Sequence, residues 1–424
     1  MTTLDLTTRD QALLSGHDGE AARIAMQIIV RMARIAGAHR LVDITGAHIG
    51  GCLYHGKASL DFAERLADAG ARTAVPATLN VSSLDLLHPA LYRGDAATAA
   101  AAKRLMEAYV AMGCEPTWTC APYQLPRRPA FGEHVAWAES NAIVFANSVL
   151  GARTERYGDF IDICAAITGR VPDVGLHRSQ HRRGRIVFRL RGLSRQLLES
   201  DVLFPVLGHF VGKAAGRLIP VFDGLRSDLC DEDRLKALGA AAASSGAVAM
   251  FHVVGVTPEA RTLEDALHRQ SPDRTIDVDS RMLRAAHEEL STARAPLTAV
   301  SLGTPHFSLA EFGRLLHLLD GVRSADHVAV YVSTGRSVLD SVRECGWLQV
   351  LEDAGITVVT DTCTYITPIL RDVRGTIMTN SAKWAWYAPG NLGVDVAFGS
   401  LAECVRSAQL GRVWRDDALW ADAT

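Results

Sequence analysis

The stretch LTAVSLGT, residues 297–304, is a continuous apolar run and the first of five such runs in the C-terminal third of the chain. The others are HVAVYVST (327–334), GITVVTDT (355–362), GTIMTN (375–380) and VDVAFGS (394–400). Segments with the apolar spacing of helices separate these runs. Strands that are apolar on both faces and alternate with helices form parallel sheets covered by helices on both sides. The sequence therefore predicts an α/β fold with parallel sheets.

The alternation extends back from this region toward the middle of the chain. GRIVFRL (184–190) predicts a strand, 204–224 predicts a strand–helix–strand passage, and 247–256 predicts a further strand. Helices are expected over 231–245, 279–293 and 336–353, and in the N-terminal third over 18–36, 58–70, 93–112 and 136–152. The last of these is nearly uncharged, which is typical of a buried helix. The whole chain, residues 1–424, is expected to form one catalytic region. Its approximate subdomains are 1–113, 114–230 and 231–424.

The composition excludes several classes of protein. With 48% apolar and 21% charged residues, a chain of 424 residues can fill more than one core. The net charge of −3 argues against a nucleic-acid binder, which usually carries a basic surface. Neither a secretory leader nor an uncharged run of about 18 apolar residues is present, so we expect a cytoplasmic protein with no membrane contact. Its eight cysteines are then thiols and not a disulfide framework.

Reactive side chains follow several of the predicted C-terminal strands. His306 and Cys363 come directly after two of them, Ser381 and Lys383 after a third, and Cys404 in the first turns of the last helix. Because ligands bind at the carboxyl ends of strands in open α/β sheets, this edge has the composition of a site.

The two thiols at this edge are open to two interpretations. Cysteine sulfur selects zinc or iron–sulfur centres, but the spacing of Cys363 and Cys404 fits no short zinc pattern and the chain has no CxxC. By spacing alone, buried structural thiols are favoured. Cys114 and Cys120 are expected to pack in a structured loop.

Several blocks carry a resemblance to a known family. They are VPATLNVSSLDLLHP (75–89), GCEPTWTCAPYQ (113–124), AWAESNAIVFANSVLGART (136–154), SLGTPHFS (301–308), TDTCTY (360–365) and NSAKWAWYAPG (380–390). In this order they resemble the aconitase X family, and the resemblance covers nearly the whole chain. It implies an aconitase-like α/β fold, with several parallel-sheet subdomains packed around a central iron–sulfur cluster site.

The resemblance also implies an activity and a partner. Members of the family are hydro-lyases. The sequences GGCLYHGKAS (50–59) and SLGTPHFS (301–308) favour the bacterial type, which dehydrates cis-3-hydroxy-L-proline to Δ1-pyrroline-2-carboxylate in hydroxyproline degradation. Dehydration of mevalonate 5-phosphate is the alternative. Because no stretch is left over for a swivelling domain, we expect the large subunit of a split enzyme that forms a heterodimer with a small subunit. A non-catalytic iron–sulfur or thiol-sensing protein is the alternative from another class.

The resemblance implies a ligand set for the cluster. Some members carry a cysteine where this chain has Thr304, so a third thiolate is needed elsewhere, and Cys52 in HIGGCLYHG is the candidate. The expected ligands are Cys52, Cys363 and Cys404. Cys114 and Cys120 are expected to lie near the cluster at most, without binding it. Three thiolates leave one iron open for Lewis-acid chemistry. A 2Fe-2S cluster is favoured and a 4Fe-4S cluster is possible.

The remaining site residues are assigned by the chemistry of dehydration. Lys383 is expected to bind the substrate carboxylate, because a cation stabilises that charge. Asn80, Ser140, Asn141, His306 and Thr304 are expected to contact the substrate. The resemblance places the base that removes the α-proton on a serine of the small subunit, and Glu139 and Ser381 are the alternatives within this chain.

Overall fold

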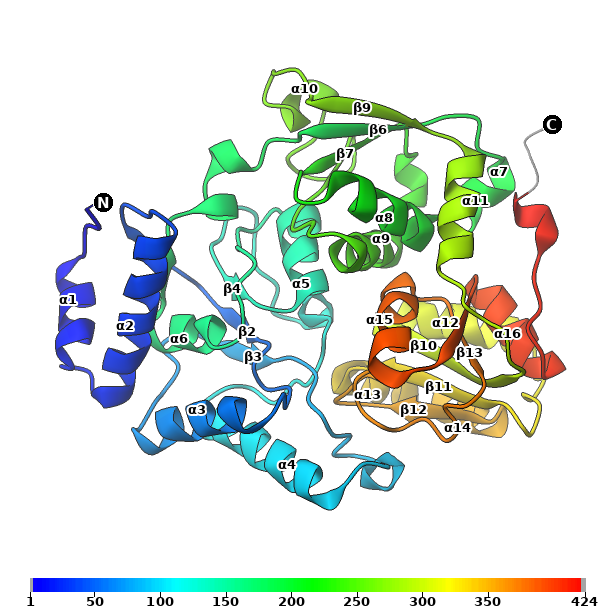
Figure 1. The fold of residues 1–424 in the computed structure, drawn as a ribbon, viewed down its shortest axis with the longest axis horizontal. Helices are drawn as coiled ribbons and strands as arrows, with labels where there is room; N and C mark the ends of the chain where they lie inside the picture. The colour runs from blue at the N-terminus through cyan, green and yellow to red at the C-terminus, as the bar shows by residue number, and fades with distance from the viewer. Residues whose placement is uncertain (1–2, 421–424) are drawn as a thin grey trace. The chain divides into compact units, whose positions relative to one another are not determined.

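The computed structural model describes residues 3–420, which fall into two units (Figure 1). The N-terminal unit holds residues 3–84 and 94–183, and the C-terminal unit holds 85–93 and 184–420. Residues 85–93 therefore belong to the C-terminal unit, although the segments before and after them belong to the N-terminal unit. The predicted α/β class with several parallel sheets is confirmed. The finer limits expected at 113/114 and 230/231, and a central cluster site, stay predictions.

The N-terminal unit is built on a parallel sheet with the strand order β3-β2-β4, and an antiparallel pair joins β1 to β5. Its strands are β1 (Leu41–Asp43), β2 (Ala47–Ile49), β3 (Ala77–Leu79), β4 (Ala136–Trp137) and β5 (Arg170–Pro172). Its helices are α1 (Thr8–Ser15), α2 (Glu20–Ile35), α3 (Lys57–Asp68), α4 (Ala96–Ala111), α5 (Ser140–Phe145) and α6 (Ile161–Thr168), with the short turns η2 (Pro122–Gln124), η3 (Ala146–Leu150), η4 (Gly175–His177) and η5 (Ser179–His181).

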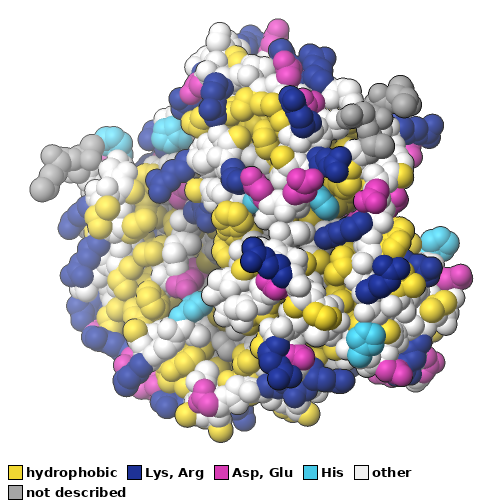
Figure 2. Space-filling model, turned by 45° about the vertical axis from the view of Figure 1, so that its right-hand side comes forward, with side chains coloured by type: hydrophobic (Ala, Val, Ile, Leu, Met, Phe, Trp, Pro, Cys, Tyr) yellow, Lys and Arg dark blue, Asp and Glu magenta, His cyan; other side chains and the backbone are white. Residues whose placement is uncertain are grey.

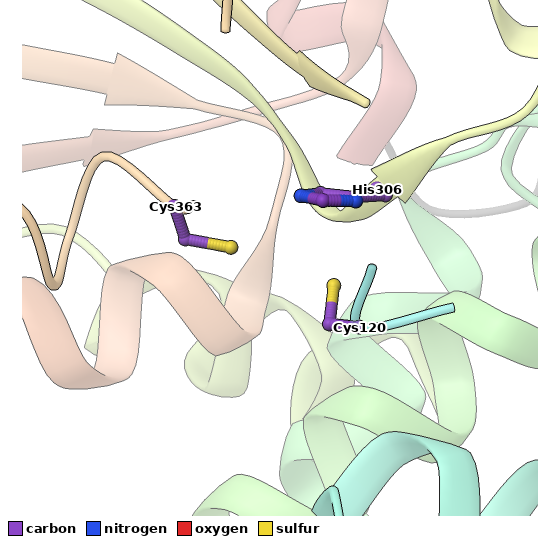
Figure 3. A group of neighbouring side chains, drawn as sticks. All are labelled: Cys120, His306 and Cys363. Carbon is purple, nitrogen blue, oxygen red and sulfur yellow. The ribbon is translucent and has the colours of Figure 1, made fainter. Parts of the chain in front are cut away.

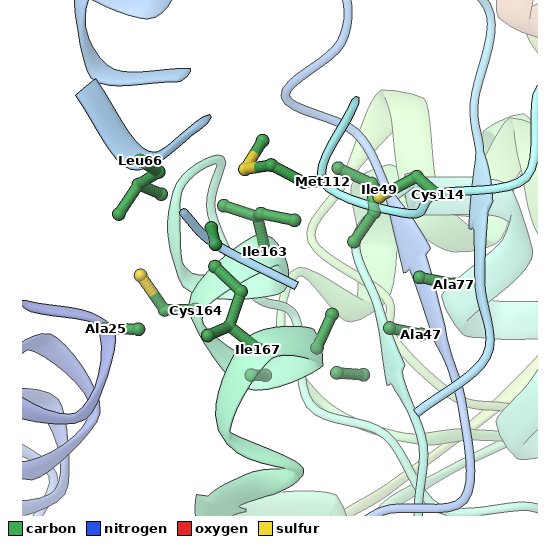
Figure 4. Close-up of a cluster of buried hydrophobic side chains, with 14 of the residues drawn as sticks. Ala25, Ala47, Ile49, Leu66, Ala77, Met112, Cys114, Ile163, Cys164 and Ile167 are labelled. Carbon is green, nitrogen blue, oxygen red and sulfur yellow. The ribbon is translucent and has the colours of Figure 1, made fainter. Parts of the chain in front are cut away.

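Helix α6 lies at the centre of this unit's core. Its side chains Ile163 and Ile167 are buried, and the core reaches Ala25 of α2 and Ile49 of β2 (Figure 4). Burying a side chain of this size stabilises the fold by roughly 1.5–3 kcal/mol, so these contacts fix α6 against the sheet. At the start of the helix, Asp162 accepts hydrogen bonds from the backbone N–H groups of residues 50 and 51, at 2.7 and 3.2 Å. The loop after β2 is therefore anchored to the core.

Residues 136–152 do not form the single helix that their apolar pattern predicts. Ala136 pairs with β2, and the backbone N–H of Ala138 donates to the carbonyl of His48 at 3.1 Å, so the segment begins as strand β4. Helix α5 starts only at Ser140, and η3 is a π-helical turn that ends before Gly151. The expected burial is confirmed for α5, in which Asn141–Phe145 are buried.

The C-terminal unit contains two fully parallel sheets, with the orders β8-β7-β6-β9 and β12-β11-β10-β13-β14. The strands are β6 (Ile186–Leu190), β7 (Pro220–Asp223), β8 (His252–Val253), β9 (Arg274–Val278), β10 (Leu297–Phe307), β11 (Ala329–Thr334), β12 (Ile356–Val359), β13 (Thr376–Thr379) and β14 (Asp395–Phe398). The helices are α7 (Arg195–Glu199), α8 (Leu203–Ala215), α9 (Glu232–Ser245), α10 (Leu263–Ala266), α11 (Ser280–Glu289), α12 (Leu309–Leu319), α13 (Arg336–Glu344), α14 (Trp347–Asp353), α15 (Ala382–Leu392) and α16 (Leu401–Leu410), with the turns η1 (Pro89–Leu91), η6 (Ser227–Leu229) and η7 (Asp417–Trp420).

All five apolar runs of the C-terminal third form strands of one sheet, as predicted. Three other expectations are wrong in detail. The passage over 204–224 begins within helix α8 and not as a strand, although its helix and its final strand, β7, are present. Only residues 252–253 of the strand expected over 247–256 pair in the sheet. The helix expected over 336–353 divides into α13 and α14 at Gly346, whose φ of 71° leaves the helical region.

Both signs of charge are interspersed on the face drawn in Figure 2, where Lys and Arg alternate with Asp and Glu around apolar side chains. Among the described residues, no helix is both long enough and apolar enough to span a bilayer.

Candidate active site

Strand β10 places His306 at the carboxyl end of the five-stranded sheet. Its pairing with β11 shifts register between Leu302 and Phe307, and Gly303 has a φ of 84°. A Cβ at Gly303 would lie 2.1 Å from the carbonyl oxygen of Ser333, so this close approach of two strands requires glycine. Beyond it, His306 is fully buried, and its Nε2 lies 3.2 Å from the carbonyl oxygen of Thr362. The imidazole is thus held at the strand end.

Cys363 lies in the loop after β12, in the same unit. Its side chain is buried, and a ring nitrogen of His306 lies within 4.8 Å of its sulfur (Figure 3). The carbonyl of Cys363 accepts hydrogen bonds from the backbone N–H groups of Ile366 and Thr367, both at 3.1 Å, which fixes a tight turn. A thiol and an imidazole at this separation are a donor pair suited to a soft metal.

Ser381 and Lys383 lie at the beginning of α15. The Ser381 hydroxyl accepts a hydrogen bond from the backbone N–H of Trp384 at 3.0 Å and donates to the carbonyl of Thr304. It therefore caps the helix and ties it to β10. Lys383 is 4% exposed, and both residues line a small cavity with Thr304 and Lys236. Since a helix N-terminus and a lysine both favour negative charge, this cavity is suited to a carboxylate.

The charge of Lys236 is matched inside the protein. Its ammonium group contacts Glu311, lies 3.1 Å from Asp233 and donates to the carbonyl of His306 at 3.3 Å. Although burial lowers the pKa of Lys236, the two carboxylates raise it by more, so the group stays protonated. Lys236 therefore holds the end of β10, while Lys383 brings positive charge to the cavity.

In the N-terminal unit, Glu139 gathers three of the predicted substrate-binding residues. Its carboxylate accepts hydrogen bonds from the side chains of Asn80 at 3.3 Å, Ser140 at 3.3 Å and Asn141 at 2.8 Å. It also caps α5 by accepting from the backbone N–H of Asn141 at 3.3 Å. The structure brings Asn80, Glu139, Ser140 and Asn141 together within this unit, and their contact with a substrate stays a prediction. Glu139 has a structural role as a cap whatever else it does.

Cys120 and Tyr123 border the same group, and sequence reasoning gave them little weight. The Asn141 side chain donates to the carbonyl of Cys120 at 3.0 Å, and the Tyr123 hydroxyl donates to Asn141 Oδ1 at 2.6 Å. Cys120 (also labelled in Figure 3) is 2% exposed. The signal that pointed to both residues was their common block, GCEPTWTCAPYQ.

The two other predicted ligands lie in hydrophobic cores. Cys52 is 1% exposed, and its S–H group lies 3.3–3.7 Å from the carbonyls of Ile49, Asn80 and Val81. Cys404 is fully buried in the core of the C-terminal sheet. Burial raises the pKa of both thiols well above the usual range. The ligand set Cys52, Cys363 and Cys404 draws on both units and stays a prediction.

Comparisons with known proteins cover almost the whole chain. Three family models match, described as the aconitase X first domain over residues 3–180, second domain over 184–288 and third domain over 297–409. The crystal structure of Thermococcus kodakaraensis aconitase X in its holo-form is similar with a TM-score of 0.86 and 32% identity, over 96% of this chain and 100% of that chain.

Curated relatives fall into two groups. The cis-3-hydroxy-L-proline dehydratase of Pseudomonas aeruginosa is 46% identical over 95% of this chain and 70% of its own length, and that of Hypocrea jecorina is 45% identical over 96% and 69%. The phosphomevalonate dehydratase large subunit of Methanothermobacter thermautotrophicus is 37% identical over 95% of this chain and 98% of its own length. By its three domain matches and these relatives, the chain belongs to the aconitase X family.

Proposed function

We propose that this chain is a hydro-lyase that removes water from cis-3-hydroxy-L-proline and yields Δ1-pyrroline-2-carboxylate. The observation that carries the proposal is the 45–46% identity to two dehydratases of that name over at least 95% of the chain, against 37% for a phosphomevalonate dehydratase large subunit. The cavity agrees with this assignment, because Lys383 and the N-terminus of α15 favour a bound carboxylate. Lys236, which also lines the cavity, is paired with Asp233 and Glu311.

We propose that an iron–sulfur cluster is the cofactor, with 2Fe-2S favoured over 4Fe-4S. The donor set fits, since Cys363 and His306 offer sulfur and nitrogen within 4.8 Å of each other at a strand end. Cys363 is its best supported ligand, and Cys52 and Cys404 remain the predicted others. An iron with an open position supplies Lewis acidity toward the leaving hydroxyl.

The chain's own residues bind and orient the substrate. Lys383 and the N-terminus of α15 hold the carboxylate in the cavity that Thr304 lines. Glu139, with Asn80, Ser140 and Asn141 attached to it, presents amide and hydroxyl groups that are already oriented. Prior orientation lowers the entropic cost of reaching the transition state.

Neither candidate base within the chain has its proton-accepting groups free for that task. Ser381 donates its proton to the Thr304 carbonyl, and the Glu139 carboxylate accepts from three side chains. We therefore propose a small swivel-domain subunit as the source of the base, in the cytoplasm, where thiols stay reduced. The 98% coverage of a relative named as a large subunit supports this arrangement.

The test is an assay of the chain co-purified with a small aconitase X subunit. With cis-3-hydroxy-L-proline, we expect formation of Δ1-pyrroline-2-carboxylate, measured by its reaction with o-aminobenzaldehyde. With mevalonate 5-phosphate under the same conditions, we expect no dehydration. Turnover of mevalonate 5-phosphate alone would reverse the assignment. A protein with a cluster but without activity on either compound would favour the sensing alternative.

A further inference from the structure

Segment 85–93 belongs to the C-terminal unit, where the carboxylate of Asp85 contacts the loop that carries Cys363. Asp85 is 4% exposed and accepts five hydrogen bonds. Three come from its own segment, from the backbone N–H groups of Leu87 at 3.0 Å and His88 at 2.8 Å and from Nδ1 of His88 at 3.0 Å. The other two come from Thr360, from its backbone N–H at 2.9 Å and its hydroxyl at 3.0 Å. A carboxylate has about four lone-pair sites, so both oxygens are saturated.

The same segment holds the loop at further points. The backbone N–H of Leu86 donates to Asp361 at 3.1 Å, and Arg93 donates to the carbonyls of Pro368 at 2.8 Å and Ile369 at 3.1 Å. Segment 85–93 thus binds the loop 360–369 on both sides of Cys363.

The loop needs this support because part of its backbone is strained. Asp361 adopts a φ of 62°, which residues other than glycine seldom do. Arg336 holds the Asp361 carboxylate with two hydrogen bonds, at 2.6 and 2.7 Å. Strained backbone persists only where its surroundings fix it, and it concentrates at ligand sites.

We propose that Asp85 is a positioning residue that holds loop 360–369 in the conformation that presents Cys363 as a metal ligand beside His306. The inference deepens the proposed function, since it rests on Cys363 as a cluster ligand. It also gives a role to the acidic residue of VPATLNVSSLDLLHP, the block in which Asn80 lies five residues before Asp85.

The test is the alkylation of Cys363 by iodoacetamide in the full chain after the cluster has been removed, followed by mass spectrometry. In Asp85→Asn, an NH₂ group replaces one carboxylate oxygen and faces hydrogen-bond donors that the oxygen accepts from in the wild type. We expect the loop to open locally and Cys363 to react at least about tenfold faster than in the wild type. Cys404, buried in the same unit, should stay unreactive. The untreated variant should also show weaker visible absorption.

Two variants serve as controls. Asp95→Asn removes a carboxylate that caps α4 at Thr98, at 2.8 Å, and should leave the Cys363 rate unchanged. If Asp85→Asn does not fold, Thr360→Val removes one of the five donors and should give a smaller increase. An unchanged Cys363 rate in both test variants would overturn the proposal, as would a parallel rise at Cys404, which indicates general unfolding. Inactivity on hydroxyproline would refute the proposed function without affecting this rate.

Discussion

The cysteines differ in what surrounds them, and this difference decides how each can be tested. Cys363 lies in a hydrogen-bonded loop beside an imidazole, and the carbonyl of Cys120 contacts the Glu139 group through Asn141. Cys52 and Cys404 lie in cores, where a thiol packs as a small apolar side chain. Ligand spacing in the sequence cannot separate these environments, because burial and neighbours depend on the fold.

Cys363→Ser is expected to abolish the visible cluster absorption of the protein as isolated. The same loss is predicted for Cys52 and Cys404, but a buried serine hydroxyl alone costs about 1–3 kcal/mol, so serine variants there mix two effects. Alanine variants of these two residues avoid the buried hydroxyl. Full absorption in Cys52→Ala or Cys404→Ala would remove that residue from the ligand set. Bleaching in Cys120→Ser would instead add Cys120 to it.

At the scale of elements, turn η4 buries a histidine that the proposed function leaves unused. His177 is 2% exposed; its Nδ1 lies 2.8 Å from Nδ1 of His134 and its Nε2 lies 2.5 Å from the Tyr157 hydroxyl. Burial, with a smaller effect of His134, lowers the pKa of His177 to about 3. The unfolded chain takes up a proton here near pH 6.5 and the folded chain only near pH 3. Stability from this group is therefore present above pH 6.5 and is lost as the pH falls toward 3.

We expect His177→Gln to flatten the pH dependence of the unfolding free energy between pH 7.5 and pH 4.5. The full span corresponds to a few kcal/mol, at about 1.4 kcal/mol for each pKa unit. Urea unfolding at both pH values gives the two free energies, and their difference is the quantity to compare with that of the wild type. His134→Gln, at a partly exposed histidine, is the matched control and should keep most of the slope. An unchanged slope in His177→Gln would contradict the assignment.

The elements that sequence predicted well are those that a continuous pattern specifies. The five C-terminal strands are apolar throughout, and α2 ends near Gly37 as its spacing indicates. The expected helix over 136–152 failed because pairing of Ala136 with β2 outweighs local helix propensity. Strand β9 was missed because most of its residues are exposed and give no apolar signal.

For the site, the sequence blocks named candidate residues but not the contacts between them. Ser140 and Asn141 lie in one block with Glu139, but the contact of Asn80 with Glu139 joins two different blocks. The two hydrogen bonds from Thr360 to Asp85 could not be foreseen, since they join residues 275 positions apart. Such pairings follow from topology and leave no local pattern.

At the scale of the whole molecule, the question is whether this chain is catalytically sufficient. It covers 98% of a relative named as a large subunit and 70% of one named as a cis-3-hydroxy-L-proline dehydratase. Removal of the α-proton needs a base within hydrogen-bond reach of that proton, or one water away. Ser381 and Glu139 already have hydrogen-bond partners, so we expect the base that removes this proton to come from a second subunit.

The purified chain is therefore expected to carry a cluster, visible by its absorption, and yet to dehydrate cis-3-hydroxy-L-proline at a negligible rate. Addition of a small aconitase X subunit should restore activity and reach its maximum near an equimolar ratio, because each site needs one base. A small subunit in which the predicted serine is replaced by alanine is the matched control, and it should bind without restoring turnover. Full activity of the chain alone would contradict this prediction. In that case the variant Glu139→Gln identifies the base. Loss of turnover with an unchanged unfolding free energy would assign the proton transfer to Glu139. Unchanged turnover would assign it to Ser381.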